Sequence, residues 1–294
     1  MTQPAPDPRP RPAATQGRPD APTAAAFASS WNTVGHGSVY TRAQFLDWME
    51  PLDPASLAGQ SVLEMGFGNG SLLAHMGDYR PARLAGIELR DTLAQTRKNL
   101  RHLPQTMLEL HHGDLTTADL GAFDLVYSIG VLHHLQDPSA GFDAVLRSTR
   151  PGGRFHCWVY AEEGNAVVIR VVDPIRRFTC NLPWWATKYG VALPLALPYF
   201  VYANVVRALS QVGGLASHLA SLAPLSEYSQ WIAERPFPFF HHVAFDQLVT
   251  PQTAYLSRAA VLSMLAHPDV DPATTYLVHR NGNSWKFGGR RRSP

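Results

Sequence analysis

The sequence predicts an α/β protein in which a doubly wound, mostly parallel sheet carries an inserted helical cap. From residue 61 to residue 160, short apolar runs alternate with helix-length stretches, which is typical of a parallel sheet covered on both faces. A glycine-dense turn follows the first run, and an apolar, proline-broken stretch interrupts the pattern after residue 161. Near the end of the chain, Asn281-Gly282 separates two strand-like runs and signals a hairpin.

Composition limits the classes of protein to consider. The chain has 294 residues and is 45% hydrophobic, enough for one large domain or a domain with a cap. Its net charge is +2 and only 16% of its residues are charged, so no single-sign field favours a nucleic-acid partner. Cys157 and Cys180 form no C-x-x-C pair, which excludes a zinc site or disulfide framework of the usual spacing. We expect no metal, a cytoplasmic location and an inert, buried Cys157.

The N-terminal region is expected to contain a tail and a short helix. Residues 1–24 are rich in Pro, Ala and Arg and predict a disordered tail without a secretory signal. Within residues 25–57, Thr41 is placed to cap a short helix that carries Phe45 and Trp48. The longest apolar run, Val191 to Val205, is broken by prolines and is too short to span a bilayer, so no transmembrane segment is expected.

The first βαβ unit organises the core, which we place at residues 58–161. Gly66, Gly68 and Gly70 alternate, and a backbone without Cβ atoms can turn sharply and let a ligand lie directly on it. Glu88 ends the second strand 18 residues after Gly70, where an acidic side chain can accept both hydroxyls of a ribose. The expected strands are 61–65, 83–89, 107–111, 123–129 and 154–160, and the helices are 70–77, 91–100 (capped by Asp91) and 141–149 (ended by Pro151-Gly152-Gly153).

Glu64 decides which ribose-bearing ligand is favoured. The glycine spacing departs from the dinucleotide fingerprint, because Ser71 occupies its sixth position. A carboxylate at the mouth of the first strand would repel a pyrophosphate but attract an α-ammonium. S-adenosylmethionine (SAM) has an ammonium, a sulfonium and no phosphate, so the pattern favours SAM over NAD.

The segment Val62 to Gly70, V-L-E-M-G-F-G-N-G, resembles the first motif of the class I SAM-dependent methyltransferases of small-molecule type. The resemblance continues at Asp114 and at Phe123 to Ile129, which is followed by V-L-H-H-L. It implies a seven-stranded sheet with a reversed last strand, which the Asn281-Gly282 hairpin fits. The cofactor contacts that it implies are Glu64, Gly66, Gly68, Gly70, Glu88, Leu89, Asp114, Leu115, Ser128 and Ile129.

The resemblance also assigns roles to some of these residues. Asp114 would accept the adenine amino group, and Ser128 and Ile129 would lie beside the methionine part of SAM. Segments ahead of the first strand often fold over the cofactor as a lid in this superfamily. Trp31 and Tyr40 are therefore candidates to cover the adenosine or face the sulfonium, since a cation is attracted to an aromatic face. Packing of both rings onto the core is the alternative.

Residues 162–240 are expected to form the cap, and 241–290 to return to the core sheet as a helix near 257–266 and the final hairpin. Caps of this kind commonly build an acceptor pocket, and an apolar cap suggests an acceptor with hydrophobic or aromatic parts. A homodimer through the cap and a membrane-surface contact are the alternatives. The segment after Phe240 loosely resembles a subgroup of bacterial small-molecule methyltransferases.

Methyl transfer is an in-line displacement that needs alignment above all, and a base only where the acceptor keeps its proton. His134 follows the fourth strand and is the candidate base, with a structural role at a helix start as the alternative. Tyr160 ends the fifth strand and could touch the acceptor. His241 and His242 would face opposite ways on a strand, so a shared metal is not expected, and Asp246 is expected to bond to loop backbone.

The predicted function is SAM-dependent methyl transfer to O, N or C of a small molecule. Two alternatives keep the same cofactor motifs. In the first, SAM is itself the substrate, for example in an intramolecular cyclisation that releases methylthioadenosine. In the second, the chain is a non-catalytic SAM-binding partner protein.

Overall fold

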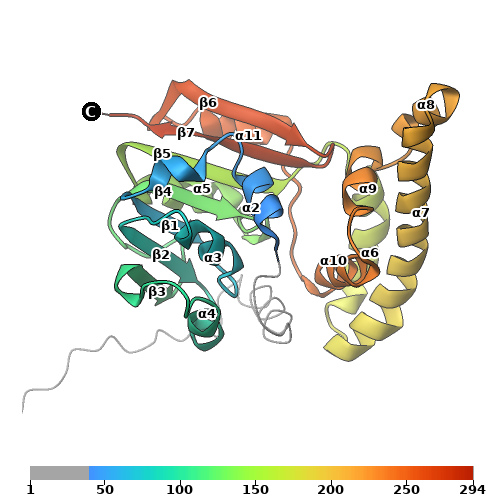
Figure 1. Ribbon diagram of the computed structural model, residues 1–294, viewed down its shortest axis with the longest axis horizontal. Helices are drawn as coiled ribbons and strands as arrows, with labels where there is room; N and C mark the ends of the chain where they lie inside the picture. The colour runs from blue at the N-terminus through green and yellow to red at the C-terminus, as the bar shows by residue number, and fades with distance from the viewer. Residues whose placement is uncertain (1–39, 294) are drawn as a thin grey trace, which may run out of the picture.

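Seven strands form one sheet in the order β3-β2-β1-β4-β5-β7-β6 in the computed structural model, which describes residues 40–293 (Figure 1). The expected tail at 1–24 and Trp31 lie outside these residues. The parallel strands are β1 (Ser61–Met65), β2 (Arg83–Glu88), β3 (Leu108–His112), β4 (Phe123–Ile129) and β5 (Thr149–Tyr160). The last strand, β7 (Ser284–Arg291), runs antiparallel to both β5 and β6 (Val270–Arg280). The predicted mostly parallel sheet with a reversed last strand is confirmed.

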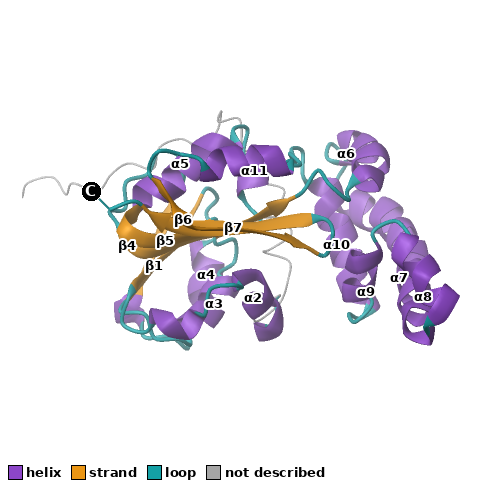
Figure 2. Cartoon of the chain, turned by 90° about the horizontal axis from the view of Figure 1, so that it is seen from above, coloured by secondary structure: helices purple, strands orange, loops and turns teal. Residues whose placement is uncertain are grey.

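Helices cover both faces of the sheet (Figure 2). One face holds α2 (Arg42–Met49), α3 (Ser71–Gly77) and α4 (Leu93–Asn99), and the other holds α5 (Pro138–Ser148) and α11 (Arg258–Leu265). Short 3₁₀ turns are η1 (Pro54–Leu57), η2 (Gln105–Met107) and η3 (Leu132–His134). Each face has its own hydrophobic cluster, because the parallel strands are buried on both sides.

Local signals explain where these helices begin. The Thr41 side chain accepts from the Gln44 N–H while Gln44 reaches back to the Thr41 N–H, a capping box that starts α2 as expected. Three expectations need correction. Helix α4 begins after Thr92, and Asp91 instead accepts from the Leu93 N–H. Helix α5 begins at Pro138 rather than 141, because Asp137 caps it and proline fits the first turn. Strand β5 begins at Thr149, so Pro151-Gly152-Gly153 lies inside a strand with an irregular register.

The cap stands beyond one end of the sheet (Figure 1). Its elements are η4 (Val168–Val172), α6 (Asp173–Thr179), η5 (Ala186–Ala192), α7 (Leu193–Val212), α8 (Gly214–Leu222), α9 (Ser226–Ile232) and α10 (Phe237–Val249). The expected boundary at residue 240 falls inside α10, because Phe240, Phe245 and Leu248 are buried against other parts of the cap. The chain rejoins the sheet near Leu256, which bridges to Ala161.

The apolar run of the cap belongs to a longer helix than expected. Ala186–Val212 is helical over 27 residues, with a mean hydropathy of 1.4 over its 18-residue window and 22% of that window buried. By length and composition alone it could cross a membrane, so the premise that prolines break this run is wrong. Pro194 lies just after the junction of η5 and α7, and Pro198 lies inside α7.

Candidate functional site

A cavity of about 660 Å³ lies between the carboxyl ends of the sheet strands and the cap. The core wall comes from the loops that follow β1, β2, β4 and β5, and the cap wall comes mainly from η4, α7, α9 and α10. Ligands of doubly wound sheets bind at the carboxyl ends of the strands, at the point where the strand order reverses. The cavity is therefore the candidate site, and the predicted residues can be checked against it.

The glycine loop forms one wall of this cavity. Gly66, Gly68 and Gly70 have φ values of +84°, +56° and +79°, in the left-handed region that glycine alone adopts without strain. A Cβ at Gly66 would collide with Val131, and one at Gly70 would lie 2.7 Å from the Thr96 methyl carbon. Gly66 and Gly68 line the cavity, whereas Gly70 caps α3 behind the loop.

Glu88 ties this loop to the end of β2. Its Oε2 accepts from the Gly68 N–H at 2.9 Å, and its Oε1 accepts from the Leu89 N–H at 2.9 Å. Burial raises the pKa of the Glu88 carboxyl. Glu88 and Leu89 both line the cavity.

Glu64 lies almost completely buried at the end of β1 and also lines the cavity. Its Oε2 accepts a hydrogen bond from the Tyr127 hydroxyl at 2.9 Å. Burial raises the pKa of Glu64 to about 8, and the nearby Glu88 carboxylate contributes in the same direction. A cation placed in the cavity would offset this accumulation of carboxylates.

Two of the four expected contacts from β3 and β4 reach the cavity. Leu115 and Ile129 line it. Asp114 is not among the described lining residues, and its Oδ1 accepts from the Thr116 N–H at 2.8 Å. Ser128 is fully buried, and its hydroxyl donates to the Met65 carbonyl at 3.0 Å, which fastens β4 to β1. Side chains alternate along a strand, so Ser128 and its neighbour Ile129 point to opposite faces of the sheet.

Aromatic side chains line the core side of the cavity, which we call the cofactor end. Tyr40 lines it and meets Trp48 edge-on, with ring centroids 4.7 Å apart, and Trp158 follows at 5.7 Å from Trp48. Tyr40 therefore lies on the cavity wall and also packs on the core through Trp48. Trp31 falls outside the described residues.

His134 and Tyr160 both line the cavity. Burial lowers the pKa of His134 to about 4, so the imidazole is neutral at pH 7 and is a weak base. Its Nδ1 lies 2.9 Å from the Gln252 carbonyl oxygen. The Tyr160 hydroxyl accepts from the Gln247 amide at 2.8 Å, and burial raises the pKa of this phenol.

The sequence also allows an acid-base cluster of His241, His242 and Asp246, although backbone bonding of Asp246 is the favoured interpretation. His242 Nε2 lies 3.1 Å from Asp246 Oδ2, and both residues line the cavity from α10. The pKa of Tyr40 is raised by burial and, secondarily, by the charge of Asp246, which places this carboxylate close to the aromatic wall. The expectation that His241 and His242 lie on a strand and Asp246 in a loop is wrong, because all three lie in α10. A helical reading puts residues four apart on one face and would have found the pair.

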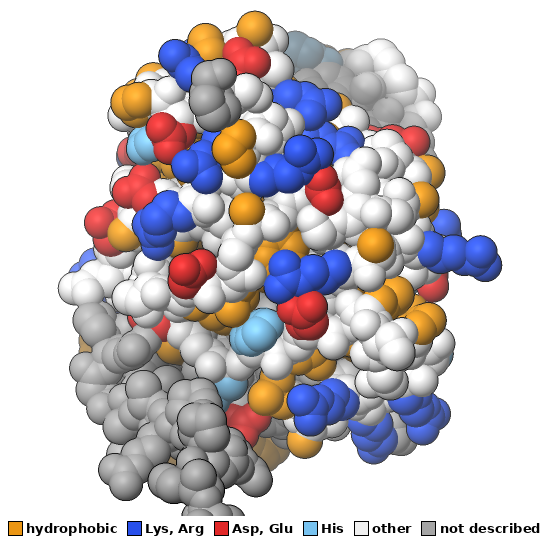
Figure 3. All heavy atoms as spheres, turned by 90° about the vertical axis from the view of Figure 1, so that its left-hand side faces the viewer, with side chains coloured by type: hydrophobic (Ala, Val, Ile, Leu, Met, Phe, Trp, Pro, Cys, Tyr) orange, Lys and Arg blue, Asp and Glu red, His pale blue; other side chains and the backbone are white. Residues whose placement is uncertain are grey.

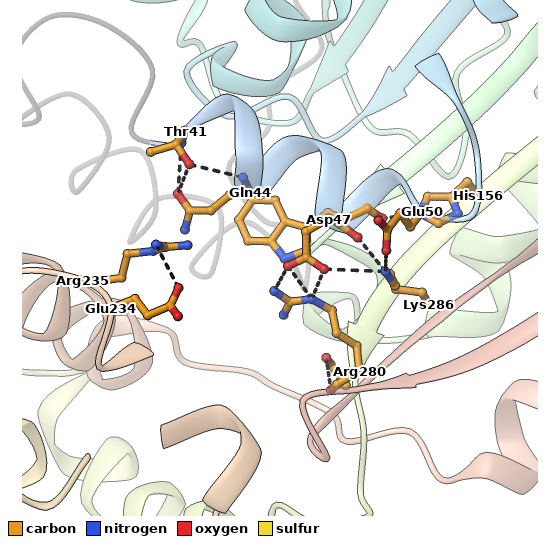
Figure 4. Close-up of polar contacts among 11 residues, drawn as sticks. Thr41, Gln44, Asp47, Glu50, His156, Glu234, Arg235, Arg280 and Lys286 are labelled. Carbon is orange, nitrogen blue, oxygen red and sulfur yellow. Dashed lines mark hydrogen bonds and ion pairs between the residues drawn. The ribbon is translucent and has the colours of Figure 1, made fainter. Parts of the chain in front are cut away.

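Ion pairs join α2 to the final hairpin beside the cavity (Figure 4). Asp47 accepts from Arg280 Nε at 2.9 Å, and Lys286 Nζ donates to the Asp47 carbonyl at 2.6 Å. The Arg280 guanidinium also lies 4.9 Å from the ring centroid of Trp231 in α9. Because Arg280, Trp231 and Trp48 all line the cavity, this cluster connects the core, the cap and the N-terminal helix.

Within residues 40–293, no group of three or more His, Cys, Asp or Glu side chains is arranged to hold a metal ion. Cys157 is buried, as expected, and burial raises the pKa of its thiol.

Comparison with known proteins finds a family that matches the core region, including the glycine loop. Residues 63–157 match the family described as "Methyltransferase domain". The chain is 31% identical over 120 residues to an uncharacterized protein, syc1184_c, of Synechococcus sp., covering 39% of this chain and 28% of that protein. It is 32% identical over 114 residues to the ubiquinone biosynthesis O-methyltransferase of Dechloromonas aromatica, covering 37% of this chain and 47% of that enzyme. The chain thus spans less than half the length of these two relatives.

Among solved structures, the N-methyltransferase NodS from Bradyrhizobium japonicum, in complex with S-adenosyl-l-homocysteine, is 12% identical, with a TM-score of 0.44 and coverage of 85% of both chains. The match of residues 63–157 confirms the resemblance that the core motifs indicate.

Proposed function

We propose that this chain, whose residues 63–157 match the methyltransferase-domain family, is a class I SAM-dependent methyltransferase that moves a methyl group from SAM to O, N or C of a small-molecule acceptor. The observation that carries the proposal is the pair of carboxylates beside the glycine loop, of which Glu64 is buried and Glu88 is half-buried. We also propose a cytoplasmic location for this activity.

The residues at the core end of the cavity fit SAM in charge and shape. An α-ammonium beside Glu64 would stabilise its ionised form, which burial otherwise disfavours. Glu88 sits where a ribose would lie on the loop, and Leu115 and Ile129 supply apolar walls. The rings of Tyr40 and Trp48 offer faces to a sulfonium.

When bound, the cofactor supplies a methyl carbon already activated by its sulfonium. The chain's contribution is alignment, which can be worth roughly 7–11 kcal/mol of the barrier. The acceptor would occupy the cap side of the cavity, which Tyr199, Tyr228 and Phe240 line. Such walls suit an acceptor with apolar or aromatic parts.

Where the atom to be methylated carries a proton, the His242–Asp246 pair is the proposed general base. In this arrangement His242 takes the proton, and Asp246, 3.1 Å away, orients the imidazole and stabilises the imidazolium that forms. His134, with a pKa of about 4, is a weak base at pH 7. We therefore assign to His134 and Tyr160 the positioning of the acceptor.

The cap side of the cavity also separates this proposal from its rivals. Intramolecular cyclisation of SAM and non-catalytic SAM binding need no second substrate, whereas residues of α7, α9 and α10 surround space beyond the cofactor end.

Product analysis tests the proposal. The purified chain is incubated with SAM and a panel of phenols, amines and carbon acids, and the products are identified by mass spectrometry. We expect the wild type to form S-adenosylhomocysteine and a methylated acceptor. With a phenol as acceptor, the His242→Asn variant should form almost no methylated product in the same time. Methylthioadenosine formed without any acceptor would instead identify cyclisation.

A further inference from the structure

The exposed side of α7 is apolar along its whole length. Its exposed residues include Leu197, Val201, Val205, Leu209 and Val212, whose spacing of three or four residues puts them on one side of the helix. Val201 is 59% exposed and Val212 is 74% exposed. An amphipathic helix on a protein surface normally turns a polar side to solvent, whereas α7 is apolar on its buried side and on its exposed side.

The same character continues in the neighbouring segments. Helix α8 exposes three leucines, and the segment before α7 exposes two tryptophans. Together these residues form what we call the outer cap face: Trp184, Trp185, Leu197, Val201, Val205, Leu209, Val212, Leu215, Leu219 and Leu222. Helices α7 and α8 lie at the end of the molecule farthest from the sheet (Figure 1).

The cap does not need this face for its own packing. The other side of α7 supplies Ala196 and Ala203 to a buried cluster with Ile232 of α9 and Phe240 of α10. The exposed residues are therefore available for another partner, and an apolar surface of this extent marks an interaction site.

Charge indicates which partner the outer cap face fits. Residues 174–226 contain no Asp or Glu, whereas Arg177 and Lys188 flank the two tryptophans in sequence. Arg177 is exposed. Lys188 is half-buried, and its Nζ lies between the rings of exposed Tyr189 and buried Phe245, 5.8 Å and 5.6 Å from their centroids. Apolar side chains bordered by cations, Trp and Tyr are typical of surfaces that lie in a membrane interface and attract anionic lipids.

We propose that the outer cap face docks on the surface of a bilayer that contains anionic phospholipid. Interfacial docking fits better than a membrane span, because the inner side of α7 packs on α9, where Arg207 donates to the Ala233 carbonyl at 3.2 Å. It also fits better than a second copy of the chain. An isologous dimer would set this face against itself, with no acidic side chain from 174–226 to meet its cations.

The cavity reaches the surface within the cap. Leu195 of α7 and Val167 and Val171 of the η4 region both line the cavity and are exposed. Resting on the proposed function, this places the entrance where a docked chain would meet lipid, and it names the acceptor class as molecules that partition into a bilayer.

Vesicle flotation tests the docking. The full chain is mixed with phosphatidylcholine vesicles made with or without phosphatidylglycerol. We expect the chain to float with the anionic vesicles, and a Val201→Glu/Val205→Glu variant to partition roughly tenfold less or weaker still. Val278→Glu, at an exposed valine on β6, is the matched control and should float like the wild type. Arg177→Glu should lose flotation with the vesicles that contain phosphatidylglycerol and should behave like the wild type with pure phosphatidylcholine vesicles.

Other results would overturn the proposal. Absence of wild-type flotation with either vesicle would do so, as would a wild-type dimer, seen by light scattering, that Val201→Glu/Val205→Glu converts to monomers without any lipid binding. Flotation by a Glu88→Ala variant that no longer binds SAM keeps the docking result separate from the proposed function. If Val201→Glu/Val205→Glu still methylates a water-soluble acceptor, a loss of flotation cannot be ascribed to misfolding.

Discussion

The core and the cap place their apolar side chains in opposite ways. At the end of the core away from the cap, hydrophobic side chains appear singly among charged and polar ones (Figure 3). In the cap, the exposed residues of α7 include a continuous apolar stripe. The core follows the pattern of a protein that meets only water and its ligand, whereas the cap has a surface that its own packing leaves over. Under the proposed function, surface chemistry thus separates a half that would bind the cofactor from a half that would meet the acceptor and its surroundings.

The largest expected effect tests whether the cap supplies chemistry as well as walls. His242→Asn should lower kcat for a phenolic acceptor by about 10²–10⁴-fold, because proton removal by a positioned base contributes that much. Binding of SAM should be unchanged, since the cofactor site belongs to the core. Steady-state kinetics and calorimetry measure the two quantities. His218→Asn, at an exposed position of α8, is the matched control. An equal loss from His134→Asn, with none from His242→Asn, would return the base to the core.

A pair of glycines contrasts the two regions in stability. Gly66→Ala should destabilise the chain by about 2–4 kcal/mol, because a Cβ at φ +84° is strained and collides with Val131. Gly190→Ala in the cap should stabilise it by about 0.4–1 kcal/mol, since nothing lies within 4 Å of its Cβ position. Denaturant unfolding measures both variants. Similar values for the two would remove the distinction between a shaped loop and an open surface.

The contact between α2 and the final hairpin holds the edge of the cavity in place. Asp47→Asn leaves the buried Arg280 without its carboxylate and leaves the buried Lys286 with only the more exposed Glu50. We expect a loss of about 1–3 kcal/mol in unfolding free energy, below the full figure for a buried pair because Asp47 is partly exposed. Asp78→Asn, which removes an exposed pair with Arg42, should change it by about 0.5 kcal/mol or less. Equal effects would show that the contact is only a surface pair.

The pH dependence of stability reports on Glu64. The folded protein holds its proton up to a pKa of about 8, whereas the unfolded chain releases it near 4.5. Between these values the folded state binds more protons, so the Glu64 contribution to stability falls as pH rises and its full cost is present above about pH 8. Without cofactor, Glu64→Gln should be more stable than wild type at pH 7 and flatter with pH, yet bind SAM more weakly. Thermal unfolding across this range would contradict this by giving parallel curves.

Sequence patterns predicted the core well because its determinants are local. Apolar runs marked β1 and β4 to the residue, and Thr41 acts as the expected cap of α2. Errors occurred where two local signals compete. Proline and phenylalanine at 236–240 hid the start of α10, and Asp137-Pro138 was passed over as the start of α5.

The rest of the site depends on contacts that local patterns do not contain. Asp47 meets Arg280 across 233 positions, and nothing near either residue announces the other. An apolar stripe on α7 has the same period whether it faces the core or solvent, so its exposure became visible only in the structure. Ser128 fits the motif, but its hydroxyl is used to hold β4 against β1.

Calorimetric titration of SAM and S-adenosylhomocysteine into the wild type, Glu88→Ala and Glu109→Gln tests the central claim most directly. Glu109 is the control because it pairs with Arg83 away from the cavity lining. We predict saturable binding of both ligands to the wild type and to Glu109→Gln, and loss or strong weakening in Glu88→Ala. Absence of binding to the wild type, or equal binding to all three proteins, would contradict the assignment of the glycine loop and Glu88 as the cofactor site.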